Sequence, residues 1–384
     1  MKRTIICSAC GLDISQDKFD ACFGWKTADQ AFVVGAQQHF KNTCAGINQF
    51  LTWLEKQRNK LAEQVAKAQQ VEVNQVLQEL SFQLVMETTG VYHEAVLLAA
   101  YDQGLPACLV LAKKVKQYLK SIGMYSKTDK LDARGISQMG CERLLRRFKP
   151  ASPKLLAIRS ALRQRQALIK HQTRLKNQLH AMTSSSHTSA EVVKSIKRLL
   201  KVVAKEVEGM TQHVTELYQA DAVLQRRLKP IIDKVKGLGL MTALTVVAET
   251  NGFAQISSRK QLASYAGYDI IENSSGKSQK PTRISKRGNV RIRSQMYMAA
   301  MSLIRTKQGP IYELYDRVRK RNPKHYKIAN VAVQRKLLLL IYTLYTTGRA
   351  YDANYHQKQN KSSSELRPEL HEIELVTKAL PLEV

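Results

Sequence analysis

The chain has 384 residues and a formal net charge of +30, because its 61 lysines and arginines outnumber its 31 aspartates and glutamates. No apolar run approaches the ~20 residues of a membrane span, and residues 1–4 lead directly into a strand-like run, so we expect neither a membrane protein nor a signal peptide. Such a surplus of positive charge predicts a polyanionic partner, most simply nucleic acid. A chain of this length also predicts two or three domains.

All six cysteines lie within the first 141 residues, at positions 7, 10, 22, 44, 108 and 141. Cys7 and Cys10 have the spacing of half a zinc site, but no second pair follows at ligand spacing. We therefore expect the two thiols to belong to a buried strand of a protein in a reducing cytoplasm.

The first 148 residues alternate between strand-like and helix-like patterns. The predicted strands cover residues 4–14, 19–23, 31–34, 82–86 and 107–111. The predicted helices cover residues 47–80, 91–103, 113–120 and a segment from about 127 to 147. This alternation is typical of an α/β layer fold, whose ligands bind near the carboxyl ends of the strands.

Four acids occupy informative places in this pattern. Asp13 lies in the first strand, Glu87 ends a later strand, and Asp129 and Asp132 lie three residues apart at the start of a helix. Two carboxylates at that spacing share a helix face about 5–6 Å apart at Cβ, which is unfavourable unless a cation lies between them or one is protonated. Acids from separate elements can therefore meet at one sheet edge and bind a metal.

An alternative without chemistry is open for each acid. Asp129 can cap the helix and Asp132 can favour its dipole. Asp13 can be a turn-forming or capping residue, and Glu87 can cap the helix that follows it. Each of these roles is ordinary by itself.

The middle of the chain reads as a helical arm. Residues 149–154 form a proline-containing linker, after which residues 155–228 carry recurrent apolar positions and almost no glycine. We predict a helical hairpin with coiled-coil character, broken near residues 183–189. Spacing and self-association are its expected roles, although its basic face can also contact nucleic acid.

A second compact region is predicted from Pro230. Residues 236–243 resemble a helix-hairpin-helix turn, whose backbone N–H groups can hold a phosphate; a plain interhelical turn is the alternative. Residues 296–305 and 331–344 are apolar helices that complete a core. Residues after 355 are rich in serine and glutamate and predict a mobile, acidic end.

A serine-rich loop at residues 273–278 precedes a basic segment in this second region. The cations of such a segment can hold phosphoryl oxygens while a serine hydroxyl attacks. A flexible surface loop is the alternative. The basic residues are Arg283, Lys286, Arg287, Arg291 and Arg293.

Several motifs together resemble the DEDD transposases, the Piv/MooV-like recombinases of the insertion sequence 110/1111 family. The acidic motifs, in order, are Gly11-Leu12-Asp13-Ile14-Ser15, Met86-Glu87-Thr88-Thr89-Gly90-Val91-Tyr92-His93 and Lys127-Thr128-Asp129-Lys130-Leu131-Asp132-Ala133. The segments that resemble that family's C-terminal transposase domain are residues 261–267, 275–276 and 284–293. The likeness extends from Asp13 to about Arg305.

The resemblance implies a RuvC-like (RNase H-like) α/β domain, which we place in residues 1–148, and a C-terminal transposase domain, which we place in 230–354. The residue patterns described above predict that the C-terminal domain is mainly α with a helix-hairpin-helix-like start, and they add a helical coiled-coil arm in 149–229 and a flexible tail in 355–384.

The resemblance also implies an active site in two parts. The first would be one or two Mg²⁺ ions held by Asp13, Glu87, Asp129 and Asp132. The second would be a serine that attacks DNA, which maps to Ser275, with the adjacent Ser274 as the alternative. The side chains expected to contact nucleic acid are Lys127, Arg283, Lys286, Arg287, Arg291 and Arg293.

The partners that the resemblance implies are donor and target DNA, a non-coding bridge RNA that pairs with both, and further copies of the chain in a dimer or tetramer. The net charge suits binding to nucleic-acid backbones. A prokaryotic, nucleoid-associated protein is expected. The rivals are a RuvC-like nuclease or resolvase in which metal-activated water attacks, and a nucleic-acid-binding protein without chemistry.

Overall fold

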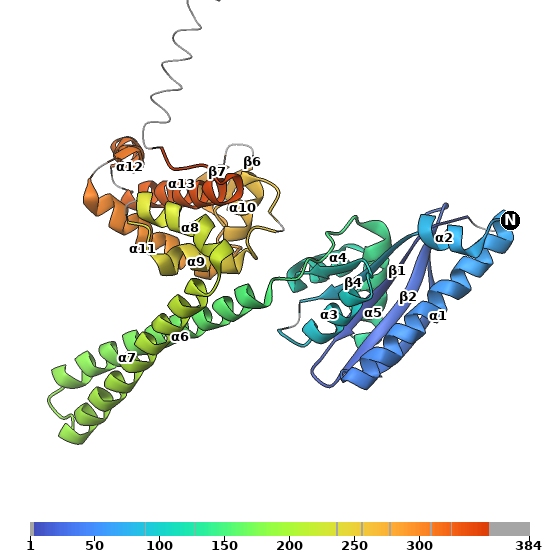
Figure 1. Ribbon diagram of the computed structural model, residues 1–384, viewed down its shortest axis with the longest axis horizontal. Coiled ribbons are helices and arrows are strands. Elements are labelled where there is room, and N and C mark those ends of the chain that lie inside the picture. Colours follow the sequence, from blue (N-terminus) through green and yellow to red (C-terminus); the bar gives the residue numbers. More distant parts are fainter. Residues whose placement is uncertain are drawn as a thin grey trace, which may run out of the picture. The chain divides into compact units, whose positions relative to one another are not determined.

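The computed structural model describes residues 4–88, 90–126, 128–235, 237–254, 256–275, 278–307, 309–323 and 325–352 (Figure 1). The chain forms two compact units, Met1–Pro150 and Ala151–Val384. The finer division into four segments stays a prediction.

Unit 1 is built on a five-stranded sheet in the order β3-β2-β1-β4-β5. Its strands are β1 (Ile5–Ile14), β2 (Lys18–Thr27), β3 (Phe32–Lys41), β4 (Ser81–Glu87) and β5 (Ala107–Val110). β1 pairs antiparallel with β2 and parallel with β4. β2 also pairs antiparallel with β3, and β4 pairs parallel with β5. The predicted α/β class is confirmed.

The third strand is longer than the sequence predicted. β3 continues to Lys41 instead of ending at Val34, and it pairs with β2 along this whole length. Residues 35–41 are mostly polar, and most are exposed on this edge strand. An edge strand with few apolar residues shows no hydrophobic alternation, so the pattern ended too early.

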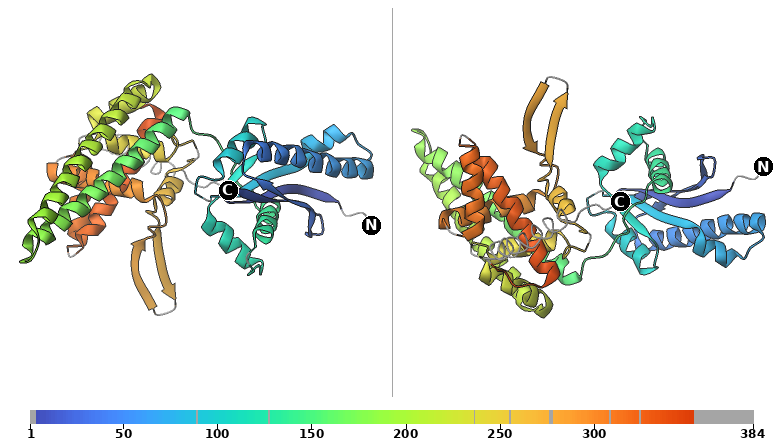
Figure 2. Two further views of the ribbon diagram at one scale, coloured as in Figure 1. Left: turned by 90° about the horizontal axis from the view of Figure 1, so that it is seen from below. Right: turned by 90° about the horizontal axis from the view of Figure 1, so that it is seen from above.

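Helices cover both faces of this sheet. They are α1 (Cys44–Gln69), α2 (Val73–Glu79), α3 (Glu94–Asp102), α4 (Ala112–Ser121) and α5 (Asp129–Glu142). Apolar side chains of α1 and α3 pack with Cys10 and Leu12 of β1, whereas those of α4 and α5 pack with Val85 of β4. α1 and α5 therefore lie on opposite faces (Figure 2).

Two predicted helices in unit 1 end earlier than expected. The helix predicted over 47–80 is divided, because Gln70 adopts a left-handed conformation with φ of 57° after α1. α5 ends at Glu142 and does not reach 147, because the Gln83 amide donates to the carbonyls of Gly140 and Arg143. The chain then bridges to β5 through Arg147.

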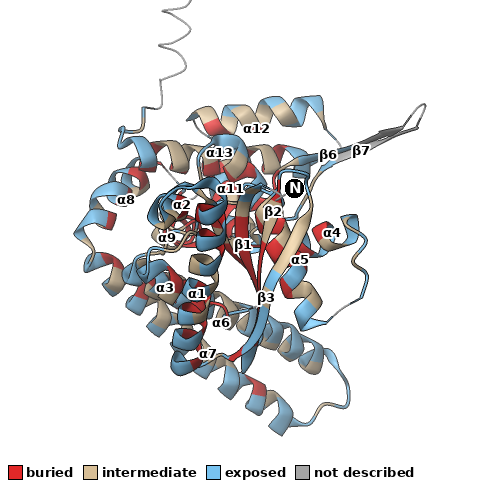
Figure 3. Ribbon diagram, turned by 90° about the vertical axis from the view of Figure 1, so that its right-hand side faces the viewer, coloured by how far each residue is buried: buried red, intermediate tan, exposed pale blue. Residues whose placement is uncertain are grey.

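Unit 2 begins with two long helices, α6 (Pro153–Ser184) and α7 (Ala190–Gln219), which pack along each other. The break between them agrees with the one predicted near 183–189. Figure 3 shows that both helices are mostly exposed, whereas buried residues fill β1 and β2 of the sheet. Coiled-coil packing within this hairpin stays a prediction.

The rest of unit 2 is mainly helical, as expected. Its elements are α8 (Ala222–Lys234), α9 (Leu240–Glu249), α10 (Arg259–Ala266), β6 (Ile270–Ser275), β7 (Ser278–Ile284), α11 (Val290–Thr306), α12 (Gly309–Arg321) and α13 (Tyr326–Thr347). Residues 242–249 of α9 are all buried, and α9 contributes to one apolar core with α11 and α13.

Three details of unit 2 differ from the predictions. Pro230, where the second compact region was predicted to begin, lies inside α8, between the buried Leu228 and Ile231, which hold the helix. α12 was not predicted. The serine-rich segment is part of a β-hairpin and not an irregular loop.

Two further predictions have simple outcomes. In the turn before α9, Gly239 precedes the first helical residue, and both the phosphate-binding turn and the plain interhelical turn stay predictions. The predicted tail lies outside the described residues. No helix in the described part of the chain is both long and apolar enough to cross a membrane.

Candidate active site

Two of the four acids lie side by side at the carboxyl edge of the sheet in unit 1. β1 and β4 are parallel neighbours, with Leu12 opposite Met86. Asp13 and Glu87 each follow that pair by one residue, so both side chains leave the sheet on the same face. That face is the one covered by α5, because Val85 lies two residues before Glu87 and packs with the side chains of α5.

Helix α5 lies unusually close to β1 because residue 11 is glycine. A Cβ atom at Gly11 would lie 2.2 Å from the Ser137 backbone nitrogen and 2.3 Å from the Ala133 carbonyl oxygen. The Ser137 hydroxyl also donates to the Ala9 carbonyl at 3.0 Å. Asp13 lies two residues beyond Gly11 and therefore faces the same helix.

The start of α5 carries the other two acids. Thr128 is the N-cap residue: it is extended, and its hydroxyl accepts from the Leu131 N–H at 3.2 Å. The alternative in which Asp129 caps the helix is therefore wrong. Asp129 is the first helical residue, its carboxylate lies 3.1 Å from the Lys18 ammonium at the start of β2, and Asp132 follows one turn later.

The charges of the other three acids affect the pKa of Asp13. Burial raises the pKa of Asp13, and the charges of Asp132, Asp129 and Glu87 raise it further, to about 6. A smaller contribution comes from Asp20. Residues distant in sequence thus act on one carboxyl group, as like charges do when they share a site.

Asp20 was missed by the sequence reasoning. It lies opposite Asp13 in the β1–β2 register and opposite His39 in the β2–β3 register. Its carboxylate is 3.5 Å from His39 Nδ1, and its side chain is 9% exposed. The available signal was an acid inside the apolar run from Phe19 to Phe23.

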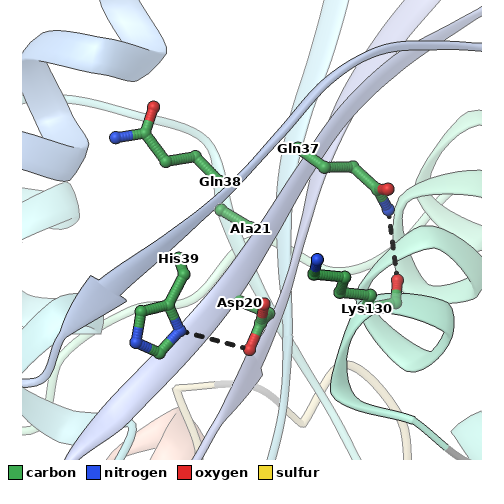
Figure 4. Close-up of a pocket in the computed structure, with 6 residues that line it drawn as sticks. All are labelled: Asp20, Ala21, Gln37, Gln38, His39 and Lys130. Atoms are coloured by element: carbon green, nitrogen blue, oxygen red, sulfur yellow. Dashed lines mark hydrogen bonds and ion pairs between the residues drawn. The ribbon is translucent and has the colours of Figure 1, made fainter.

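A shallow cavity of about 180 Å³ lies beside this row of side chains. Figure 4 shows the His39 ring turned toward Asp20 and the Gln37 amide turned toward α5. The Gln37 amide donates to the Lys130 carbonyl at 3.2 Å. β3 and the first turn of α5 are thereby joined at the margin of the acidic edge.

The acids suit a hard divalent cation, since carboxylate oxygens are the ligands that Mg²⁺ and Mn²⁺ prefer. Among the described residues, however, no three His, Cys, Asp or Glu side chains are arranged to hold a metal ion. Repulsion among like charges and the pairing of Asp129 with Lys18 favour a more open arrangement. The four-residue metal set stays a prediction.

The predicted nucleophile lies at the end of the hairpin in unit 2. β6 and β7 pair as far as Ser275 opposite Ser278, and the hairpin projects from the helices (Figure 2). Gly276 and Lys277 lie outside the described residues, as do the side chains of Ser274 and Ser275. The catalytic role of either serine stays a prediction.

The basic residues after this hairpin divide into two groups. Arg283, Lys286 and Arg287 are exposed. Arg291 and Arg293 are half-buried: Arg293 Nη1 donates to the Ala266 carbonyl at 2.7 Å, and Arg291 Nε lies 3.9 Å from Glu249. All five stay predicted contacts, but only the first three present exposed cations. Lys127 lies outside the described residues.

A buried carboxylate that the sequence reasoning missed joins the arm to this basic segment. Glu249 ends α9, and its side chain is 3% exposed. Arg163 of α6 donates two hydrogen bonds to it, at 2.7 and 2.9 Å, and the Asn289 amide donates a third at 2.7 Å. Burial by itself raises the pKa of Glu249, but these donors hold it below its usual value.

The segment between β7 and α11 is held by backbone contacts as well. The Asn289 N–H donates to the Tyr265 carbonyl at 2.8 Å, and the Tyr265 hydroxyl donates to the Glu249 carbonyl at 2.7 Å. The Asn289 side chain caps α11 by accepting from the N–H groups of Arg291 and Ile292. Asn289 therefore fixes the basic segment between α9, α10 and α11.

Two transposase family models and several known proteins are similar to this chain. Residues 10–187 match the family model of the IS110 DEDD transposases, and residues 229–316 match that of the IS116/IS110/IS902 transposase family. The pilin gene-inverting protein of Moraxella bovis is 23% identical over 366 residues, which cover 93% of this chain and 100% of that protein.

Two further similarities cover less. The transposase for insertion sequence element IS1111A of Coxiella burnetii is 27% identical over 224 residues, 53% of this chain and 60% of that protein. Among solved structures, T. thermophilus RuvC in complex with a Holliday junction substrate aligns with 34% of this chain and 90% of its own, at 13% identity and a TM-score of 0.21.

Proposed function

The chain belongs to the IS116/IS110/IS902 family of DEDD transposases, DNA-modifying enzymes, and from that premise we propose that it cuts and rejoins DNA with a carboxylate-held Mg²⁺ site and a serine nucleophile. The observation that carries the proposal is the position of the four acids: Asp13 and Glu87 leave neighbouring parallel strands on the face covered by α5, and the first turn of α5 carries Asp129 and Asp132. Burial and the charges of the other three acids raise the pKa of Asp13 to about 6, which supports a cation site at this edge.

Asp13, Glu87, Asp129 and Asp132 would hold one or two Mg²⁺ ions. A bound Mg²⁺ polarises the phosphate and stabilises negative charge on its attacking and leaving oxygens. These acids lie at the ends of strands and at the capped start of α5, where the backbone is held by hydrogen bonds. The Lys18 ammonium, 3.1 Å from Asp129, neutralises part of the charge before DNA arrives.

In the covalent step, the Ser275 hydroxyl oxygen attacks the phosphorus of a scissile phosphodiester. A phosphoserine bond forms, the bond from phosphorus to one sugar oxygen breaks, and that oxygen takes up a proton while the serine loses one. The phosphodiester energy is thereby conserved for rejoining with the hydroxyl of a second strand. The exposed cations Arg283, Lys286 and Arg287 would hold the phosphate oxygens.

A bridge RNA would supply the sequence recognition, and the protein would bind RNA and DNA mostly through their backbones. The net charge of +30 supports binding of the protein to RNA and DNA backbones. RNA that copurifies with the protein should pair with both donor and target sequences. Recombination that survives complete removal of RNA would contradict the guided mechanism.

The covalent step has a direct test. Wild-type protein, Ser275→Ala and Ser274→Ala are incubated with end-labelled donor DNA and Mg²⁺, and the products are separated under denaturing conditions. Wild type should give a labelled protein–DNA adduct, Ser275→Ala should give none, and Ser274→Ala should retain it. The reverse result moves the nucleophile to Ser274.

The same experiment separates the rival functions. Cleavage by both serine variants without any adduct identifies a nuclease or resolvase that uses water. DNA binding without cleavage by wild type, and without dependence on Mg²⁺, identifies a binding protein with no chemistry. Asp132→Asn should lose the adduct but keep DNA binding.

We further propose that a dimer or tetramer shares its active sites, so that the serine of one subunit acts with the carboxylates of another. Recombination requires several strands to be cut in step, which such sharing would enforce. A mixture of Asp129→Ala and Ser275→Ala proteins should regain part of the activity that each has lost. A mixture that stays inactive, although mixed oligomers form, would contradict sharing.

A further inference from the structure

A basic helix face lies beside the carboxylates and was not part of the predicted DNA contacts. From Gln103 to Thr128 the sequence has five lysines and no aspartate or glutamate. The four that the structure describes all lie in α4, and all four are exposed: Lys113, Lys114, Lys116 and Lys120. None of the four forms an ion pair within the described part of the chain.

The orientation of α4 is fixed by its apolar side. Val115 and Tyr118 are buried, and Leu119 and Ile122 pack against the same cluster with Ile136 of α5. These positions repeat at the spacing of one helix face. Lys113, Lys116 and Lys120 repeat at i, i+3 and i+7 on the opposite face, so all three ammonium groups point to solvent.

The place of α4 relative to the acids is fixed at two points. At its start, the Ala112 N–H donates to the Thr88 hydroxyl at 3.4 Å, and Thr88 follows Glu87. Along its length it meets α5 where residue 135 is glycine: a Cβ atom at Gly135 would lie 2.1 Å from Leu119 Cδ2. The lysine face therefore adjoins the sheet edge that carries the acids.

We propose that the face formed by Lys113, Lys116 and Lys120, here called the α4 lysine face, binds the backbone of the DNA whose scissile phosphate reaches the carboxylates. This inference rests on the proposed function for the position of that phosphate. Four carboxylates repel DNA until a cation is bound, so cations beside them are needed to draw the duplex in. Phosphate contacts of this kind fix the register of the duplex without reading its sequence.

The experiment compares two triple variants with the same loss of charge. The test protein carries Lys113→Gln, Lys116→Gln and Lys120→Gln. The control carries Lys56→Gln, Lys60→Gln and Lys67→Gln, which are exposed lysines of α1 on the opposite face of the sheet. Thermal unfolding of both should match wild type, because none of these side chains is buried.

Binding to a donor duplex is measured across a salt series in EDTA, so that no cleavage occurs. Each duplex phosphate contact contributes about 0.9 to the slope of log affinity against log salt, so the test protein should lose about 2.7 from the slope. Its affinity near physiological salt should fall at least ~10-fold. The control should keep the wild-type slope, and hydroxyl-radical footprints should lose protection beside the cleavage point only in the test protein.

Three outcomes would overturn the inference. The test protein binds DNA like wild type, or both triple variants lose the same slope, or the test protein loses affinity for RNA while its DNA slope is unchanged. Because the assay contains no chemistry, an absent serine adduct in wild type would overturn the covalent mechanism and leave the binding result standing. An unchanged slope beside a normal adduct overturns only the α4 lysine face.

Discussion

A carboxylate shielded from solvent occurs in each unit, partly buried for Asp13 and almost fully buried for Glu249, and the surroundings of the two are opposite. In unit 1, every charge that shifts the pKa of Asp13 is that of another acid, and the pKa rises to about 6. In unit 2, burial also raises the pKa of Glu249, but two hydrogen bonds from Arg163 and one from Asn289 reverse the effect and leave it lowered. Burial is common to both sites.

The difference separates a chemical site from a structural one. Glu249 has its full complement of cationic and amide donors inside the protein, so it stabilises the fold and has little capacity left for a ligand. The acids around Asp13 accumulate negative charge, which costs stability and favours a cation from outside. Four predictions test this contrast, in order of decreasing effect.

Asp132→Asn should lower DNA cleavage by about 10³-fold or more, because an amide cannot replace a carboxylate in a cation site. The thermal unfolding midpoint should not fall, since a negative charge has been removed from a repulsive group. Cleavage rates at saturating DNA and Mg²⁺, together with calorimetry, measure both effects. Full activity with lowered stability would reverse the assignment of this region as the chemical one.

Glu249→Gln should cost about 3 kcal/mol of folding stability, because the amide has one acceptor oxygen instead of two for the donors of Arg163 and Asn289, and it removes the negative charge that pairs with the Arg163 guanidinium. DNA cleavage by the folded fraction should fall far less than in Asp132→Asn. Thermal unfolding measures the loss.

A double-mutant cycle provides the control for that stability loss. Arg163→Gln alone should also destabilise the fold, and the two changes together should cost about 1–3 kcal/mol less than the sum of the single effects. Strict additivity would show that the pair does not interact as the 2.7 Å contact indicates.

Asp13→Asn should stabilise the protein in EDTA by about 1–2 kcal/mol at neutral pH, after allowance for the partial exposure of Asp13. The pKa is raised in the folded protein, from an ordinary value of 3.8 to about 6, so the wild-type protein loses stability as pH rises through this range. The advantage of the variant should therefore be absent below pH 3.8 and complete above about pH 6. A gain that is independent of pH would point to packing instead of charge.

Lys18→Gln should change folding stability by less than about 0.5 kcal/mol, because the Lys18–Asp129 pair is half-exposed and solvent screens it. Unfolding by urea measures the stability. A large stability loss would place this pair with Glu249 and weaken the contrast.

The fold class was predictable because strands and helices with one apolar face carry their own periodicity. β3 shows the limit: residues 35–41 pair with β2 through their backbone while their side chains are mostly polar and exposed. The β6–β7 hairpin was missed for the same reason. Backbone pairing at an edge requires no hydrophobic pattern.

Some residues of the candidate sites could likewise be predicted from the sequence, and others could not. The acids that end strands or begin helices were predictable from their places in the pattern. The choice between Thr128 and Asp129 as the cap was not, because both residue types cap helices well and only the side-chain geometry decides. Glu249 was hidden because Arg163 and Asn289 lie 86 and 40 residues away in the sequence.

The close contact at Gly11 also determines which parts of the acidic edge can move. β1 and the middle of α5 touch through backbone atoms, so we expect Asp13 and α5 to move together. Adjustment during turnover is then left to side-chain rotation, chiefly that of Asp129, whose partner Lys18 is half-exposed. The amides of residues 133–137 should accordingly exchange with solvent among the slowest in unit 1, and a DNA-bound protein should change there least.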